Sequence, residues 1–332
     1  MASCSSRRTP TGAGRMILFV TDPLVGLHAD IDATIGLMAA SQDLGHDVWC
    51  CQPEELAVID GRLQVRAHRI RLRPRRPGRD HRWIVDPTWY DELQAALVDV
   101  ADFAVVHVRI DPPVDDRYLH LTYLLDLANT RVVNRPDGIR AVHEKLIALR
   151  FPELCPATYV GTSVVALREF VARHGSAIVK PVDGFAGLDV WLVHDDHAAM
   201  SLLESATRGG RRQVIAQEYL PAVAHGNKRL FLLDGEIIGA VLRRPDCSDF
   251  RIGPPVALAP IDAADKEIAA ALRPILIQHG LTIAGADVIG GRLIEVNVTC
   301  PGGMHKTDAL LGTTLSQSIV QHLTRVREGV LT

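Results

Sequence analysis

The chain has 332 residues, 47% of them hydrophobic and 23% charged, and a formal net charge of −3 at pH 7. This balance is typical of a globular protein with room for two or three hydrophobic cores, and it argues against a nucleic-acid partner. The six cysteines form no CxxC pair, which argues against a zinc cluster or a disulfide framework and favours reduced thiols in the cytoplasm.

Residues 1–15 are polar and turn-rich, and they are predicted to be a disordered leader because they contain no apolar stretch of the secretion-signal type. Ordered structure is expected to begin at Met16, where "MILFVTDP" is typical of a buried parallel strand that enters a loop. No later segment has about 18 uninterrupted apolar residues, so no membrane span is predicted.

Residues 16–135 predict an alternating α/β domain. A helical pattern follows the first strand, and "DFAVVHVRIDPP" predicts a later strand that ends at Arg109 and Asp111. Loops at the carboxyl ends of such strands commonly bind ligands, so Arg109 is a candidate anion ligand, with a surface ion pair as the alternative. Nine arginines lie within residues 62–82, and their alternation favours the solvent side of an edge hairpin over a site for an anionic polymer.

Only five of the 36 basic residues are lysines, and two of them, Lys145 and Lys180, suggest a nucleotide site. Lys180 introduces the turn "VDGFAG" between two predicted antiparallel strands. An ammonium group beside backbone amides freed by glycine suits a phosphate chain, so the turn is predicted to be a flap over a triphosphate. The Walker spacing GxxxxGK[ST] is absent. The alternative is that both lysines lie on the surface.

Two further segments extend this predicted site. The strand-like run "RQVIAQEYLPA" leads into residues 217–220, which can present backbone groups and a carboxylate to an adenine nucleoside. The run "GNKRLFLLDGEIIGAVLRRP" predicts a hairpin that turns at Asp234 and Gly235. Antiparallel pairing is expected to gather four cations that need an anion, namely Lys228, Arg229, Arg243 and Arg244.

The last predicted hairpin, "GADVIGGRLIEVNVTCPGG", carries a candidate metal site. Glu295 and Asn297 are two positions apart, so their side chains share one face of a strand, and Asp287 can lie across from them. Two carboxylates and an amide oxygen suit Mg²⁺, which completes its shell with phosphate and water. The alternative is a polar stripe that faces solvent, but the apolar residues Val296 and Val298, which fill the opposite face, weaken it.

The order of these segments resembles that of the ATP-grasp ligases, and most of all the prokaryotic glutathione synthetases, over residues 16–325. The resemblance implies an α/β ATP-grasp fold with an N-terminal Rossmann-like domain at 16–135, a lid subdomain at 136–205 and a C-terminal α+β domain at 206–332. The colinear stretches are "DP" at 22–23, "RxDPP" at 109–113, "VNRP" with "EKL" at 133–146, "KPxDG" at 180–184, "AQxYLP" at 216–221, "KRxxxxDGE" at 228–236 and "DxIGxRLxEVNVT" at 287–299.

The resemblance also implies a role for each matched residue. ATP would be held by Lys145, Lys180, Gly184, Gly187, Gln217, Glu218, Tyr219, Leu220 and Lys228. Two Mg²⁺ ions, or Mn²⁺ in their place, would be held by Asp287, Glu295 and Asn297. The transferred phosphoryl group would be stabilised by Arg229, Arg244 and Arg251, and the amino-acid or γ-glutamyl substrates would be bound by Asp22, Arg109, Asp111 and Thr299. A carboxylate would attack the γ-phosphate, and an amine would capture the acyl phosphate as an amide.

Departures from the family pattern concentrate at the substrate end. Ile110 replaces a lysine, Asn227 replaces an aspartate, and "CPGGMHK" stands where the family has Ser-Pro-Thr, with Lys306 at the place of an acid. In the flap, Ala186 replaces a glycine, and the loop "DFRIGPPVALAP" has lost glycines and an asparagine. These changes predict substrates other than γ-glutamylcysteine and glycine.

Two other functions remain open at this point: a non-catalytic, ATP-binding regulatory protein on the same scaffold, and a phosphotransferase. The lost loop glycines favour the first, whereas Asp287, Glu295 and Arg229 favour a ligase. The resemblance also implies a homodimer or homotetramer.

Overall fold

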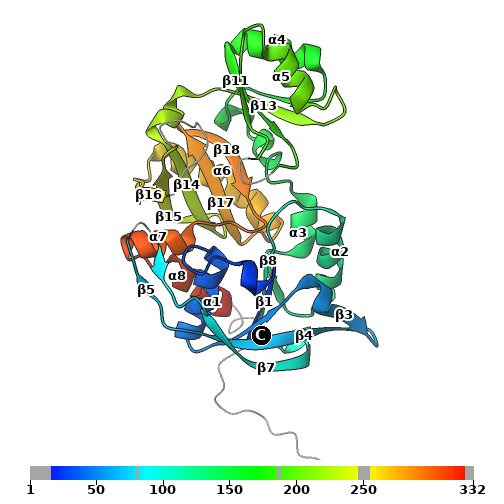
Figure 1. Ribbon diagram of the computed structural model, residues 1–332, viewed down its shortest axis with the longest axis vertical. Helices are drawn as coiled ribbons and strands as arrows, with labels where there is room; N and C mark the ends of the chain where they lie inside the picture. The colour runs from blue at the N-terminus through cyan, green and yellow to red at the C-terminus, as the bar shows by residue number, and fades with distance from the viewer. Residues whose placement is uncertain (1–15, 80–81, 185–187, 246–254, 326–332) are drawn as a thin grey trace, which may run out of the picture.

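The computed structural model describes residues 16–79, 82–184, 188–245 and 255–325. The predicted leader at 1–15, and with it Ala186, Gly187, Arg251 and Gly253, lies outside the described residues. Three sheets follow one another along the long axis, with the N-terminal sheet at the bottom of Figure 1 and the green α4 and α5 region at the top.

The first sheet is built around parallel strands, as the sequence predicts. Successive side chains of β1 point to opposite faces of the sheet. Leu18 and Val20 pack with α2 (Asp116–Leu125), whereas Ile17 and Phe19 pack with α1 (Ala33–Asp43) and α8 (Leu315–Arg325). A helix layer therefore covers each face. The strands are β1 (Met16–Thr21), β2 (Asp47–Cys51), β3 (Leu56–Ile59), β4 (Arg62–Leu72), β7 (Tyr90–Asp99), β8 (Val105–Arg109) and β9 (Arg131–Val133), in the order β3-β4-β2-β1-β8-β9 with β7 beside β4.

The arginine-rich segment is not an edge hairpin, which corrects that expectation. Strand β4 pairs with β7 along one side and with β2 and β3 along the other. The predicted alternation is confirmed, since Leu63, Val65 and Ala67 are buried while Arg62 and Arg66 are exposed. The long partner β7 moves the sheet edge away from the arginines. The short strands β5 (Arg76–Pro77) and β6 (Trp83–Ile84) pair separately.

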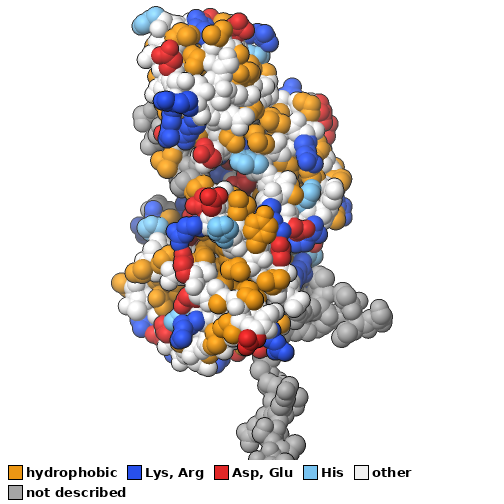
Figure 2. Space-filling model, turned by 90° about the vertical axis from the view of Figure 1, so that its right-hand side faces the viewer, with side chains coloured by type: hydrophobic (Ala, Val, Ile, Leu, Met, Phe, Trp, Pro, Cys, Tyr) orange, Lys and Arg blue, Asp and Glu red, His pale blue; other side chains and the backbone are white. Residues whose placement is uncertain are grey.

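The second sheet forms the lid, with strand order β10-β13-β11-β12 and every pair antiparallel. Its elements are β10 (Thr158–Gly161), α4 (Val164–His174), β11 (Ser176–Pro181), β12 (Trp191–His194), α5 (Ala199–Ala206) and β13 (Val214–Glu218). Because β13 pairs with β10 and β11, the lid extends beyond the expected boundary at residue 205. In Figure 2 the lid stands as an upper lobe on the body, and basic and acidic side chains are interspersed over this face.

The third sheet is antiparallel in the order β16-β15-β14-β17-β18. The predicted turn between β14 and β15 is confirmed, since Asp234 and Gly235 adopt φ values of 47° and 78°, as a two-residue hairpin requires. The remaining elements are α3 (Pro136–Ala141), β14 (Asn227–Leu233), β15 (Glu236–Arg243), β16 (Pro255–Leu258), α6 (Ala263–Gln278), β17 (Ile283–Ile289), β18 (Arg292–Asn297) and α7 (Met304–Leu311).

Asn134 joins the first sheet to the third. Its Nδ2 donates to the carbonyl oxygens of Ile283 and Val298 at 2.7 and 2.6 Å, and its Oδ1 accepts from the Ile283 amide at 2.9 Å. All of these groups are buried, so the contacts fix β9 against β17 and the end of β18. None of the described helices combines the length and the apolar character that crossing a membrane would need.

Candidate functional site

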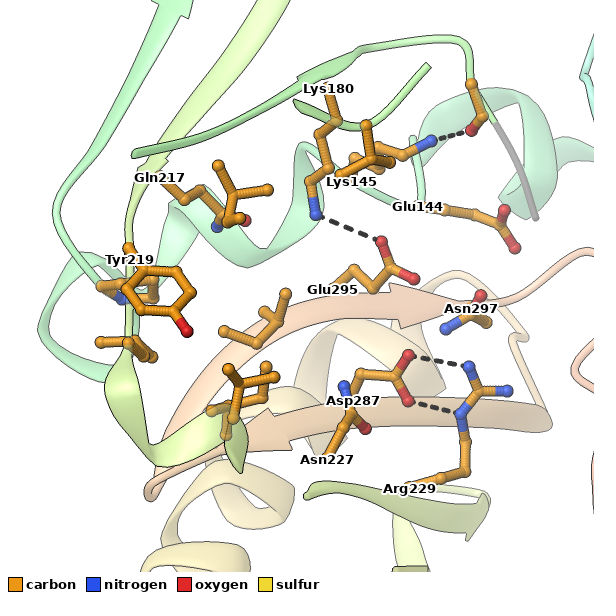
Figure 3. Close-up of a pocket in the computed structure, with 18 of the residues that line it drawn as sticks. Glu144, Lys145, Lys180, Gln217, Tyr219, Asn227, Arg229, Asp287, Glu295 and Asn297 are labelled. Atoms are coloured by element: carbon orange, nitrogen blue, oxygen red, sulfur yellow. Dashed lines mark hydrogen bonds and ion pairs between the residues drawn. The ribbon is translucent and has the colours of Figure 1, made fainter. Parts of the chain in front are cut away.

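The lid sheet and the third sheet enclose a cavity of about 430 Å³. Lys145, Lys180 and Gln217 reach it from the lid side, and Asp287 and Asn297 reach it from the third sheet (Figure 3). The described lining carries four cationic and four carboxylate side chains, namely Lys145, Lys180, Arg229, Arg243, Glu144, Glu218, Asp287 and Glu295. Such a lining suits a ligand that carries charged groups.

The predicted metal hairpin has the expected geometry. Strand β17 pairs Asp287 with Glu295, and Gly285 with Asn297, so the three oxygen-bearing side chains line one pocket. Asp287 is fully buried, and so are Val296 of β18 and Val298 just beyond its end, so the solvent-facing stripe is wrong. The described residues include no group of three or more His, Cys, Asp or Glu side chains placed to hold a metal ion. Two carboxylates and an amide remain, which is a donor set that Mg²⁺ accepts when phosphate oxygens complete it.

Asp287 is held by two arginines. Arg229 contacts it through two hydrogen bonds, Nε to Oδ1 at 2.5 Å and Nη2 to Oδ2 at 2.8 Å, and Arg243 Nη2 lies 2.7 Å from Oδ1. Burial alone would raise the pKa of Asp287, but the two guanidinium groups hold that pKa well below its usual range. Burial, with Arg229 beside it, lowers the pKa of Arg243. Two cations therefore share one carboxylate, which leaves them with the capacity to bind an anionic ligand as well.

Arg243, and not Arg244, is the second arginine of this site, which corrects the expectation. A regular two-residue hairpin would place residue 244 on the same face as Arg229. One extra residue, Ile238, shifts the register between Phe231 and Leu232, so that Asn227 faces Arg243. Arg243 therefore shares the face of Arg229, whereas Arg244 is exposed and does not line the cavity.

Lys228 also lies elsewhere, so only two of the four expected cations converge. Neighbouring residues on a strand face opposite sides, and Arg229 takes the side of the cavity. Lys228 Nζ donates to Asp265 Oδ2 at 2.5 Å, Asp262 Oδ2 at 2.9 Å and the Pro260 carbonyl at 3.0 Å. Burial opposes the charge, but the bonds to Asp265 and Asp262 raise the pKa of Lys228. This lysine holds the start of α6 and lies away from the candidate phosphate site.

Lys145 and Lys180 both line the cavity, so the surface alternative is wrong for this pair. Lys180 is buried, and its Nζ lies 3.4 Å from Glu295 Oε2. Lys145 Nζ donates to the carbonyl oxygens of Val182, at 3.2 Å, and Gly184 in the flap turn. Burial lowers the pKa of Lys145; Glu295 opposes that shift and Lys180 adds to it. Both ammonium groups are therefore close to the flap and to the metal hairpin.

The end of β13 lines another part of the cavity, on the opposite side from Arg229 and Asn297 (Figure 3). The buried Gln217 and the adjoining Glu218, Tyr219 and Leu220 line it at the end of β13, as predicted for the adenine segment. Ile178 and Ile294 contribute apolar walls. Apolar walls with backbone and amide groups at one edge suit a planar base.

Sequence reasoning assigned no role to Glu144, although it adjoins Lys145. Its Oε1 accepts hydrogen bonds from the Val298 amide at 2.6 Å, the Thr299 amide at 2.8 Å and Thr299 Oγ1 at 2.9 Å. Glu144 therefore fixes the chain that leaves the metal hairpin, and it ties Thr299 to the cavity wall.

The other candidate substrate residues gather beside this point. Arg109 is 4% exposed and donates to Thr34 Oγ1 at 3.3 Å and the Pro301 carbonyl at 3.2 Å, so the surface ion pair is wrong. Asp22 Oδ2 accepts from the Asp111 amide at 3.2 Å. Burial raises the pKa of Asp111, against a hydrogen bond from Cys300 that lowers it. Pro112, in the same loop, lines the cavity.

Comparison with known proteins identifies the family. The sequence model of the prokaryotic glutathione synthetase N-terminal domain matches residues 16–140, and that of the ATP-grasp domain matches residues 144–312. The chain belongs to the prokaryotic glutathione synthetase family. It is 38% identical over 315 residues to a glutathione synthetase of Synechococcus elongatus, which covers 92% of this chain and 97% of the relative, and 34% identical over 316 residues to one of Nitrosomonas europaea, with the same coverage.

Solved structures support the same fold. A D-cycloserine synthetase aligns with a TM-score of 0.60 at 20% identity over 93% of this chain and 99% of its own. A RiPP-associated ATP-grasp ligase of Chryseobacterium gregarium aligns with a TM-score of 0.61 at 15% identity over 94% and 97%. The predicted α/β ATP-grasp fold is confirmed, and the chain is a glutathione synthetase-like, peptide-bond-forming ligase. The family uses ATP and divalent metal ions.

Proposed function

We propose that the cavity binds MgATP and that the protein joins the carboxylate of an amino acid or γ-glutamyl compound to the amine of an amino acid. The observation that carries this proposal is the arrangement of charges: two lysines on the lid side oppose two arginines and three oxygen ligands of the third sheet across one cavity. This arrangement suits a reaction that needs positioning and charge neutralisation of a phosphoryl group more than a protein nucleophile.

Asp287, Glu295 and Asn297 fit two Mg²⁺ ions, or Mn²⁺ in their place. The Nδ2 of Asn297 donates to the Gly285 carbonyl at 3.3 Å, so its Oδ1 is the atom left to bind a cation. Bound ions would neutralise charge on the β- and γ-phosphates. Asp287 would then exchange its arginine contacts for the metal, and those arginines would become available to anionic oxygens.

The lysines, arginines and flap would hold the reacting groups in line. A substrate carboxylate oxygen attacks the γ-phosphorus and ADP leaves, and the amine nitrogen then attacks the acyl carbon, loses a proton and releases phosphate. All four cations line the cavity. Arg229 and Arg243 would contact the transferred phosphoryl group, and Lys145 and Lys180 would contact the rest of the phosphate chain. Arg109, Asp22, Asp111 and Thr299 would bind the amino-acid substrates beside the cavity.

The proposed identity of the two substrates depends on the positions at which this sequence differs from the family pattern. Ile110 and Cys300 alter the groups around Arg109 and Asp111, whereas Lys306 adds a cation near Asp30 and Asp32. Burial lowers the pKa of Lys306, and Arg82 adds to this shift. We therefore propose a pair other than γ-glutamylcysteine and glycine, such as one that yields another γ-glutamyl peptide or a dipeptide.

Release of ADP and phosphate across a panel of acids and amines tests this proposal, with γ-glutamylcysteine and glycine as the reference pair. Turnover with another pair that exceeds the reference supports the divergent substrate. Efficient glutathione formation would sink that part and leave the ligase intact. Turnover with no pair would contradict the ligase.

The alternatives have their own tests. Glu295→Gln should abolish turnover in a ligase, whereas partner binding by a regulatory protein would persist. Hydroxylamine should trap a hydroxamate from an acyl phosphate, which a phosphotransferase would not form. We also propose a cytoplasmic location and a homodimer or homotetramer. Light scattering on the purified chain would check the number of subunits.

A further inference from the structure

Asn227 is a buried residue at the wall of the cavity, and its side-chain amide is only partly hydrogen-bonded. It is the first residue of β14, is 1% exposed and lies opposite Arg243 in the strand pairing. Its Oδ1 accepts from Arg243 Nη2 at 2.9 Å. Its Nδ2 has no hydrogen-bond partner among the described residues. Figure 3 shows this side chain beside Asp287, at the floor of the cavity.

The orientation of the amide follows from its neighbour. A guanidinium group has only donors, so the atom of Asn227 that faces Arg243 must be the oxygen. The NH₂ group is then the end that lacks a partner. The nearby carboxylate of Asp287, which accepts from Arg229 and Arg243, is not a hydrogen-bond partner of this NH₂ group. A buried donor without an acceptor is unfavourable, so an acceptor is expected from a ligand.

Arg243 provides a second donor of the same kind. Its Nη2 is shared between Asn227 Oδ1 and Asp287 Oδ1, and its Nε is buried without a partner among the described residues. Two unused donors on adjoining side chains, one of them cationic, suit a group that presents several acceptor oxygens. A phosphoryl group is such an acceptor.

We propose that Asn227 is a positioning residue for the phosphate chain of the nucleotide, with Oδ1 orienting Arg243 and Nδ2 donating to a phosphate oxygen. This inference rests on the proposed function, in which the cavity binds MgATP. An aspartate, which is the residue expected here from the family resemblance, would satisfy Arg243 but would donate nothing. It would also add a fifth carboxylate to a described lining that has four carboxylates and four cations.

The direct test is Asn227→Asp, because aspartate has the same shape and retains the acceptor for Arg243. Nucleotide binding is measured by calorimetry for MgATP and by NMR titration for adenosine, without acid or amine substrates. We expect the dissociation constant for MgATP to rise at least about tenfold, the effect of losing a charge-assisted hydrogen bond, and that for adenosine to stay unchanged. The matched control is Asn129→Asp, which makes the same charge change at an exposed position and should leave both constants unchanged.

Asn227→Ala gives a second reading. It removes the donor without adding a carboxylate, so its MgATP affinity should also fall at least about tenfold if the lost hydrogen bond, and not the added charge, is the cause. Its turnover should fall further, because Arg243 loses its support. Unaltered MgATP binding by Asn227→Asp, or an equal loss of adenosine binding, would overturn the inference. Failure of the unmodified protein to bind MgATP would instead contradict the proposed nucleotide site, so the two failures are distinguishable.

Discussion

Arg243 and Arg244 are adjacent in the sequence and chemically identical, and the structure assigns them opposite consequences. Arg243→Gln removes one of the two guanidinium groups from the buried Asp287, which lies 2.7 Å away. Arg244→Gln removes an exposed charge that does not line the cavity. Arg244→Gln is therefore a matched control for Arg243→Gln.

The expected magnitudes follow from the contacts. At 2.7 Å the attraction between Arg243 and Asp287 is roughly 6 kcal/mol for an effective dielectric constant of about 20. The cost of burying both charges offsets most of it, and Asp287 retains Arg229, so Arg243→Gln should lower the free energy of unfolding by about 1.5 to 3 kcal/mol. Loss of one donor to the transferred phosphoryl group should lower kcat by about 10²- to 10³-fold. Arg244→Gln should change the free energy of unfolding by less than about 1 kcal/mol.

The assay combines urea unfolding with steady-state release of ADP, using the most active acid and amine pair. We expect kcat of Arg243→Gln to fall while that of Arg244→Gln stays within about twofold of the unmodified enzyme. An equal fall in kcat for both substitutions would refute the reasoning that the register shift at Ile238 places Arg243, and not Arg244, in the site. Full activity of Arg243→Gln would refute its contact with the phosphoryl group.

Two further predictions concern the lysines. Lys228→Met should lower the free energy of unfolding by roughly 3 kcal/mol, because it leaves the buried Asp265 without its cation. Its MgATP affinity should be unchanged. Urea unfolding and calorimetry measure the two quantities, and weakened MgATP binding would contradict the position of Lys228 outside the cavity. Since burial lowers the pKa of Lys145, its ammonium charge is lost as pH rises at a lower pH than for an ordinary lysine. MgATP affinity measured against pH should fall there in the unmodified protein and show no such step in Lys145→Met, and identical pH profiles would contradict the role of this charge.

Local patterns were sufficient to predict several strands and the pairing of the hairpin that carries the candidate metal ligands. Glu295 and Asn297 share a face because side chains alternate along a strand, and a tight antiparallel hairpin brings Asp287 across from them. The two-residue turn at Asp234 and Gly235 was equally clear. Such features depend on neighbours within about ten residues.

The errors arose where the outcome depends on register or on distant pairing. Alternation alone should have separated Lys228 from Arg229, but the choice between Arg243 and Arg244 depends on one bulged residue that no local pattern marks. Strand β13 was recognised as a strand, yet only its pairing with β10 and β11 shows that it belongs to the lid. Asn134 looked like part of a boundary, whereas its side chain bonds to groups about 150 residues away.

The measurement that tests the central claim most directly is transfer of oxygen from the acid substrate to phosphate. The acid is prepared with ¹⁸O in its reacting carboxylate, and the phosphate released during amide formation is analysed by mass spectrometry. A ligase that works through an acyl phosphate places one ¹⁸O atom in phosphate for each amide bond formed. Amide formation that leaves the released phosphate free of ¹⁸O would contradict the mechanism proposed for this site.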